Sequence, residues 1–123
     1  MTGADRFIQE LEGLGYGVER VPVGNDVYAV IRNFEVPLGQ FEGRVIDLGL
    51  KARSDYPRQV DSAIHVRATP QLFEKNDSKP GVRNIIDSPL GSEWRYWSRN
   101  FNWRIDRTVR RLMNQIYGVF KNA

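Results

Sequence analysis

The chain has 123 residues and a mass of 14.2 kDa, which is the length of a single domain. Hydrophobic residues make up 41% and charged residues 27%, a balance that excludes disorder and permits a core without disulfides. The absence of cysteine excludes a disulfide framework and a thiol nucleophile, and the single histidine argues against a zinc site. No apolar run approaches the roughly 20 residues of a membrane span, so we expect a cytoplasmic protein without metal, cofactor or membrane contact.

The net charge of +3 conceals an uneven distribution along the chain. Residues 1–50 carry four basic and eight acidic side chains, a net charge of −4. Residues 51–123 carry fourteen basic and seven acidic side chains, a net charge of +7. Such a polar molecule suits a nucleic acid or equally a protein partner, but solvated faces are the commoner explanation.

The first half of the chain predicts one helix and three strands. Four apolar residues at helical spacing predict a short helix near the start, which a glycine-rich stretch ends: Phe7, Ile8, Leu11 and Leu14. Residues 18–23 and 27–34 alternate as strands around a Gly-Asn-Asp turn, which indicates a hairpin. A third strand follows over about residues 41–52 and ends at the turn sequence SDYP.

The second half predicts one more strand, a long loop and a helix. Residues 63–68 form the fourth strand, and residues 71–92 are rich in Gly, Pro, Asn, Asp and Ser, which is typical of a loop. The helix has Asp106 as its expected N-cap and one apolar stripe: Val109, Leu112, Met113, Ile116 and Phe120. The pattern predicts a single α+β domain over residues 1–123, with a four-stranded antiparallel meander between two helices.

Three stretches together resemble a known superfamily: PLGQFEGRVIDLGLKARSDYP, VRATPQL and WRYWSRNFNWRIDRTV. A strand ending in SDYP, a further strand, a proline-ended segment and a tryptophan-rich segment resemble the ubiquitin-conjugating enzyme (UBC) fold of the UBC/RWD-like superfamily. Over about residues 15–120 the chain is most similar to a prokaryotic UBC-like family, the bacterial family E type. The resemblance implies a bacterial ubiquitin-like conjugation pathway, with a ubiquitin-like protein and an activating-enzyme-like protein as partners.

The sequence departs from the UBC pattern at the catalytic positions. Thr69-Pro70-Gln71 stands where the resemblance places a His-Pro-Asn motif, so only the proline matches, and no cysteine follows it. A thioester requires a sulfur nucleophile, which serine replaces poorly. Ser78 and Ser88 lie in the loop where the cysteine would be sought, and neither has a base close in sequence. His65 is a candidate general base, although a packed histidine on a strand is the simpler interpretation.

The candidate binding residues come from the SDYP turn, the Thr-Pro step and the tryptophan-rich segment: Asp55, Tyr56, Pro57, Thr69, Pro70, Trp97, Arg99 and Trp103. Structural roles compete with each of them: Asp55 as a turn former, Tyr56 as a packed ring and the tryptophans as core anchors. The basic residues around the turn predict either an anion-binding patch or a solvated face: Lys51, Arg53 and Arg58.

Three functions follow from these observations. The first is a catalytically deficient UBC-like domain that binds or scaffolds a ubiquitin-like protein or its activating enzyme. The second is an active carrier with an unorthodox or replaced nucleophile. The third is a single-stranded nucleic-acid-binding module, in which tryptophans that alternate with arginines provide a stacking platform. We expect the first of these and no nucleic-acid partner.

Overall fold

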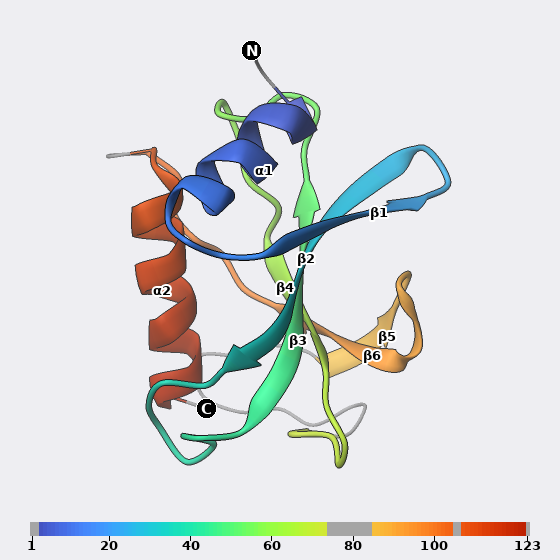
Figure 1. Ribbon diagram of the computed structural model, residues 1–123, viewed down its shortest axis with the longest axis vertical. Coiled ribbons are helices and arrows are strands. Elements are labelled where there is room, and N and C mark those ends of the chain that lie inside the picture. Colours follow the sequence, from blue (N-terminus) through green and yellow to red (C-terminus); the bar gives the residue numbers. More distant parts are fainter. Residues whose placement is uncertain (1–2, 74–84, 105–106, 123) are drawn as a thin grey trace.

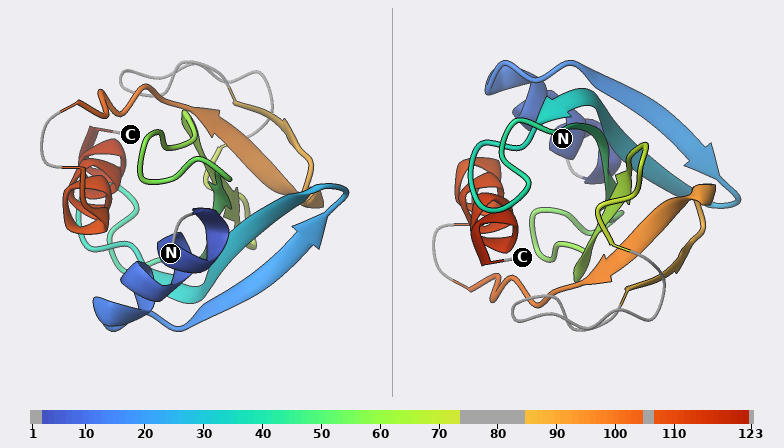
Figure 2. Two further views of the ribbon diagram at one scale, coloured as in Figure 1. Left: turned by 90° about the horizontal axis from the view of Figure 1, so that it is seen from above. Right: turned by 90° about the horizontal axis from the view of Figure 1, so that it is seen from below.

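The computed structural model describes residues 3–73, 85–104 and 107–122, which form two helices and six strands (Figure 1). In chain order the elements are α1 (Gly3–Gly13), β1 (Val18–Val23), β2 (Asp26–Glu35), β3 (Val45–Ala52), β4 (Ala63–Arg67), β5 (Ile85–Ser88), β6 (Gly91–Ser98) and α2 (Val109–Asn122). The strands form one antiparallel sheet in the order β1-β2-β3-β4-β6-β5. Helices α1 and α2 lie together on one side of the curved sheet (Figure 2).

This architecture confirms the predicted α+β class with a helix at each end of an antiparallel meander, and it adds two strands. Residues 71–92 are not all loop, because β5 and the start of β6 lie within them. Ile85 of β5 pairs with Trp97 of β6, and Ile86 pairs with Tyr96. The end of the predicted loop therefore forms a hairpin with the tryptophan-rich segment. The third strand also begins later than expected, at Val45, because two backbone hydrogen bonds close a turn before it: the Val36 N–H donates to the Arg44 carbonyl, and the Gly43 N–H donates to the Val36 carbonyl.

The helix side of the sheet holds the main core. The predicted stripe on α2 is confirmed, since all five of its side chains are buried, and Val119 joins them. A T-shaped contact of 5.0 Å between the rings of Phe7 and Tyr56 packs α1 against the SDYP turn. The Thr108 hydroxyl accepts the Arg111 N–H at 3.2 Å and caps α2. The expected cap, Asp106, lies outside the described residues.

The opposite side of the sheet holds a smaller apolar cluster of Tyr28, Val30 and Trp94. Tyr28 and Val30 alternate along β2 with side chains that point to the helices, so both faces of this strand are buried. Gly49 in β3 has no side chain where Leu90 and Trp94 approach, and a Cβ there would come within 2.7 Å of Leu90. None of the described helices is long and apolar enough to span a bilayer.

Candidate functional site

The segment that stands in place of the His-Pro-Asn motif follows β4 directly. Thr69 and Pro70 are exposed and joined by a cis peptide bond, and the Arg44 guanidinium donates to the Pro70 carbonyl. Gln71 Nε2 donates to the Glu93 carbonyl at 2.5 Å, which ties the segment to β6. Leu72 and Phe73 after it are buried, so the chain is anchored on both sides of an exposed Thr-Pro step.

A groove of about 430 Å³ lies beside this step, where β3 and β4 diverge; we refer to it as the β3–β4 groove. It is lined by Asn33, Val45, Ile46, Asp47, Arg67, Ala68, Thr69, Gln71 and Glu93. Arg67 donates twice to Asp47 Oδ2, from Nε at 2.9 Å and from Nη2 at 2.6 Å, and its guanidinium lies 4.8 Å from the ring centroid of Trp94. These contacts hold the Arg67 side chain in place in the wall of the groove. The Val45 side chain, which also lines the groove, is 53% exposed.

The structure brings together two of the three candidate catalytic residues, although they are 23 positions apart. His65 Nδ1 lies 2.7 Å from Ser88 Oγ, and Ser88 Oγ also accepts the Leu90 N–H at 3.1 Å. His65 is 1% exposed and packs edge-on against the rings of Tyr28 and Tyr96. Burial, assisted by the nearby charge of Lys51, lowers the pKa of His65 to about 4. The third candidate, Ser78, lies outside the described residues.

This pair is poorly arranged for acyl transfer. General bases work best when their pKa lies near the operating pH, and a histidine with a pKa of about 4 is a weak acceptor for a serine proton. Ser88 is only 8% exposed, so an incoming carbonyl would need the surrounding cluster to open. Its hydrogen bond instead connects β4 to the end of β5, which is a structural role for buried polar groups.

The SDYP turn is fixed by contacts to α1 and to the tryptophan-rich segment. The Gly3 N–H donates to the Tyr56 carbonyl at 2.9 Å, and Tyr56 OH donates to the carboxylate of Glu10. Trp103 Nε1 donates to the Pro57 carbonyl at 2.7 Å. The hydrogen bond from Arg53 lowers the pKa of Asp55. Tyr56 is fully buried, whereas Asp55 and Pro57 reach the surface.

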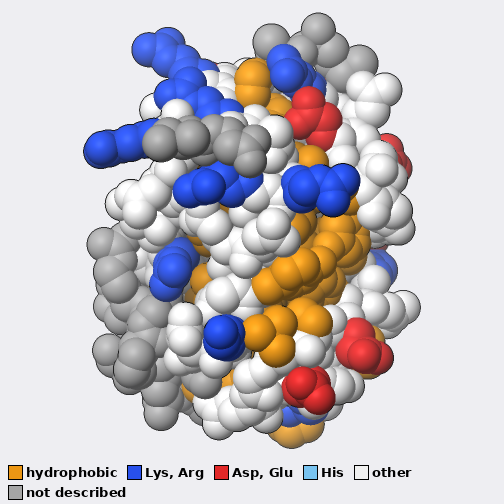
Figure 3. Space-filling model, turned by 90° about the vertical axis from the view of Figure 1, so that its left-hand side faces the viewer, with side chains coloured by type: hydrophobic (Ala, Val, Ile, Leu, Met, Phe, Trp, Pro, Cys, Tyr) orange, Lys and Arg blue, Asp and Glu red, His pale blue; other side chains and the backbone are white. Residues whose placement is uncertain are grey.

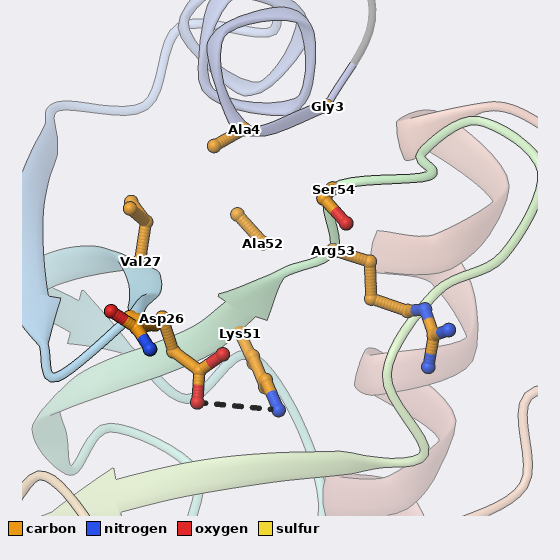
Figure 4. A pocket seen from close by; sticks show the side chains of 9 residues that line it. Gly3, Ala4, Asp26, Val27, Lys51, Ala52, Arg53 and Ser54 are labelled. Carbon is orange, nitrogen blue, oxygen red and sulfur yellow. Dashed lines mark ion pairs between the residues drawn. The ribbon is translucent and has the colours of Figure 1, made fainter.

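A shallow pocket of about 370 Å³ lies above this turn, between the start of α1 and the β1–β2 hairpin (Figure 4). Lys51 and Arg53 both line it, but each already faces an acidic group. Lys51 Nζ lies 3.6 Å from Asp26 Oδ2, and Arg53 Nε lies 2.8 Å from Asp55 Oδ1. Paired cations of this kind support the solvated-face interpretation over an anion-binding patch.

The remaining candidates separate by burial. Trp97 and Trp103 are 1% and 8% exposed, and Trp94 is 5% exposed, so all three serve as core anchors and offer no open ring for base stacking. Arg99, Thr69 and Pro70 reach the surface, and their role in binding stays a prediction.

Several site residues escaped the sequence analysis, because they are brought together only by strand pairing. Asp47 pairs with Arg67 across β3 and β4, and Glu93 approaches from β6. The sequence does show an acidic residue in one strand and a basic residue in the next. It predicts that they pair only if the register between the two strands is already known. Within the described part of the chain, no three His, Asp or Glu side chains are grouped to hold a metal ion.

Comparison with known proteins gives one match. The family model described as prokaryotic E2 family E matches residues 4–121. No curated protein and no solved structure matches the chain significantly. E2 is the general term for a ubiquitin-conjugating enzyme, so the match relates this domain to ubiquitin conjugation. Together with the helix–sheet–helix fold and the Thr69-Pro70-Gln71 segment after β4, it shows that the chain belongs to prokaryotic E2 family E and lacks the cysteine of an active carrier.

Proposed function

We propose that the chain is a catalytically deficient E2-like domain that binds or scaffolds a ubiquitin-like protein or its activating enzyme. The observation that carries this proposal is the absence of cysteine from all 123 residues of a chain whose family match spans 4–121. A carrier that forms a thioester needs a sulfur nucleophile. Because adenylation of a ubiquitin-like protein consumes ATP, we place this role in the cytoplasm. We expect no nucleic-acid partner, because the three tryptophans are buried and offer no ring for base stacking.

The β3–β4 groove supports non-covalent binding of an extended peptide, such as the tail of a ubiquitin-like protein. Strand β3 begins at Val45, but the described pairing with β4 begins only at Asp47, which lies opposite Arg67. Val45 and Ile46 therefore pair with β2 and leave their other edge toward the groove. An exposed strand edge binds an extended peptide through main-chain hydrogen bonds. The amides of Asn33 and Gln71 add side-chain groups at the same place.

Two exposed apolar residues allow a matched test of this surface. Val45 and Ile86 are 53% and 46% exposed, and only Val45 lines the groove. We expect Val45→Glu to weaken binding of the ubiquitin-like protein at least about tenfold in calorimetry, a loss typical of an interface contact. Ile86→Glu should bind like the unmodified chain. Equal affinities for both variants would contradict the placement of the site in the β3–β4 groove. No binding of the ubiquitin-like protein and none of its activating enzyme would contradict the proposal.

One observation favours a second function, that of a carrier with a hydroxyl nucleophile. Ser88 Oγ and His65 Nδ1 are 2.7 Å apart, which is within reach for proton transfer. In such a reaction Ser88 Oγ would form an ester bond with the terminal carbonyl of the ubiquitin-like protein. The bond to the leaving AMP or thiol would break, and His65 would accept the serine proton. An ester at Ser88 in mass spectrometry that is absent from Ser88→Ala would establish this function.

A further inference from the structure

A groove of about 440 Å³ lies along the beginning of α2; we refer to it as the arginine groove. It is lined by Arg99, Asn102, Arg110, Arg111, Asn114 and Gln115, and none of these described residues carries a carboxylate. Lys and Arg side chains gather on the face of the molecule that α2 occupies, most densely toward the top of the view (Figure 3). The beginning of α2 lies toward the upper end of the molecule, whereas the chain that leaves β4 runs to the lower end (Figure 1).

The wall of the groove that precedes α2 is firmly held. Phe101 and Trp103 are buried, and the exposed Asn102 between them is turned outward. Asn102 has a positive φ of 49°, and its N–H donates to Asn100 Oδ1 at 2.9 Å. The Arg104 N–H donates to the Asn102 carbonyl at 2.8 Å. These two bonds hold the backbone of Asn102 in place, which lowers the entropy lost when a ligand binds there.

The positive charge of Arg104, Arg110 and Arg111 is not neutralised by an ion pair within the described part of the chain. Residues 99–123 contain six basic side chains and one acidic side chain, Asp106. No described carboxylate lies within ion-pair distance of Arg104, Arg110 or Arg111. The Nε atom of Arg111 is buried and has no hydrogen-bond partner among the described residues. A buried donor of this kind gains from an added acceptor.

Helix stability does not explain this arrangement. The N-terminal end of a helix carries partial positive charge and favours acidic residues, yet the first turn of α2 contains no acid and contains Arg110 and Arg111. Arg107 precedes α2 by two positions and adds a further positive charge at the same end. The cluster therefore opposes the helix that carries it, which is expected when the charges serve a ligand.

We propose that the arginine groove binds an acidic peptide segment of a protein partner. Guanidinium groups bind carboxylates with two parallel hydrogen bonds, and the three amide side chains can both donate to and accept from a peptide backbone. A single-stranded nucleic acid would need exposed aromatic rings for its bases, whereas the nearby Trp103 is buried. This inference goes beyond the proposed function, because it assigns a second contact at another end of the molecule.

The test uses the full chain and a fluorescein-labelled oligoglutamate peptide, with fluorescence anisotropy as the readout. We expect saturable binding at about 50 mM NaCl that weakens at about 200 mM, as charge-dominated contacts do. Arg110→Glu and Arg111→Glu should each lower the affinity at least about tenfold. Lys121→Glu is the matched control, because it makes the same charge change at the other end of α2 and should lower the affinity less than about threefold.

Misfolding cannot mimic the expected result, because Arg110→Glu places an acid at the favourable end of the helix. Its melting temperature should be equal to or higher than that of the unmodified chain. Four results would overturn the inference: no binding of oligoglutamate, equal binding of an oligoglutamine peptide, an equal loss in Lys121→Glu, or tighter binding of an oligothymidine than of oligoglutamate. None of these depends on the adduct chemistry or on the β3–β4 groove.

Discussion

On the helix side of the sheet, α1 and α2 pack apolar stripes against the strands, and the buried side chains there form one continuous cluster. On the opposite side, a small cluster of Tyr28, Val30 and Trp94 adjoins the polar pair of His65 and Ser88. These two are the buried polar residues of the described chain. Apolar residues that recur at helical spacing cover the helix side of the sheet. The opposite side is instead held by contacts between strands that are far apart in the sequence, and by one buried hydrogen bond.

Both proposed binding surfaces open at the edges of these two layers and not within them. The β3–β4 groove opens beside the Thr69-Pro70 step, and the arginine groove opens beside α2. His65 and Ser88, the candidates for catalysis, are buried beside the smaller cluster instead, where their hydrogen bond connects β4 to β5. We therefore infer that the chemistry-bearing residues of this chain serve its fold and that its surface serves binding.

The largest effect is expected on the helix side. Leu112 is 2% exposed in the main core, so Leu112→Ala should lower the free energy of unfolding by about 2–5 kcal/mol. Chemical denaturation measures this change. Arg110→Ala on the exposed face of the same helix is the control and should change stability by less than about 0.5 kcal/mol. An unchanged stability of Leu112→Ala would show that the stripe is not packed as described.

The opposite side should respond to pH through His65. The pKa of His65 is about 4 in the folded chain, against 6.5 for an ordinary histidine. Between these two pH values His65 is therefore protonated in the unfolded chain and neutral in the folded chain. The stabilisation is complete above pH 6.5 and is lost as the pH falls toward 4, with a total of about 3 kcal/mol. Denaturation curves from pH 7 to 4.5 measure it. In His65→Gln the free energy of unfolding should depend less on pH. If its pH dependence were unchanged, other groups would be responsible for the loss of stability.

A third prediction concerns the loop that closes the helix side at the end of α2. Gly39 and Gly43 have nearly the same positive φ, 86° and 87°, so alanine strains the backbone similarly at both. A Cβ at Gly39 would lie 2.2 Å from the Phe120 carbonyl oxygen, whereas Gly43 has open space. Gly39→Ala should therefore be less stable than Gly43→Ala by about 1–3 kcal/mol in thermal unfolding. Equal melting temperatures would contradict the contact between this loop and α2.

The smallest expected effect is on tryptophan fluorescence. Because the three tryptophans are buried, native emission should be blue-shifted and should not change when a single-stranded oligonucleotide is added. Quenching at physiological salt, with a steep loss of binding as salt rises, would instead support the nucleic-acid function.

The helix side was largely predictable from the sequence. The stripe on α2 has a helical period, and the alternation over residues 18–23 and 27–34 correctly indicated the β1–β2 hairpin. These signals are local, because they depend on residues within a few positions of one another. The α+β class and the β1–β4 meander follow from them.

The opposite side was not predictable in the same way. Strand β5 has only four residues, and turn-forming residues such as Asp87, Pro89 and Gly91 lie within or beside it, so its sequence resembles a loop until β6 is placed beside it. The His65–Ser88 bond spans 23 positions, and the Asp47–Arg67 pair spans 20. Such contacts depend on strand order and register, which a single sequence does not determine.

The most direct test of the account is an adduct assay on the unmodified chain. The chain is incubated with a ubiquitin-like protein, its activating enzyme and ATP, then separated on gels with and without thiol and hydroxylamine. Because the sequence contains no cysteine and His65 is a weak base, we predict no adduct under either condition and non-covalent binding alone. An adduct that resists thiol and is cleaved by hydroxylamine would be an oxyester, and it would make this protein an active carrier.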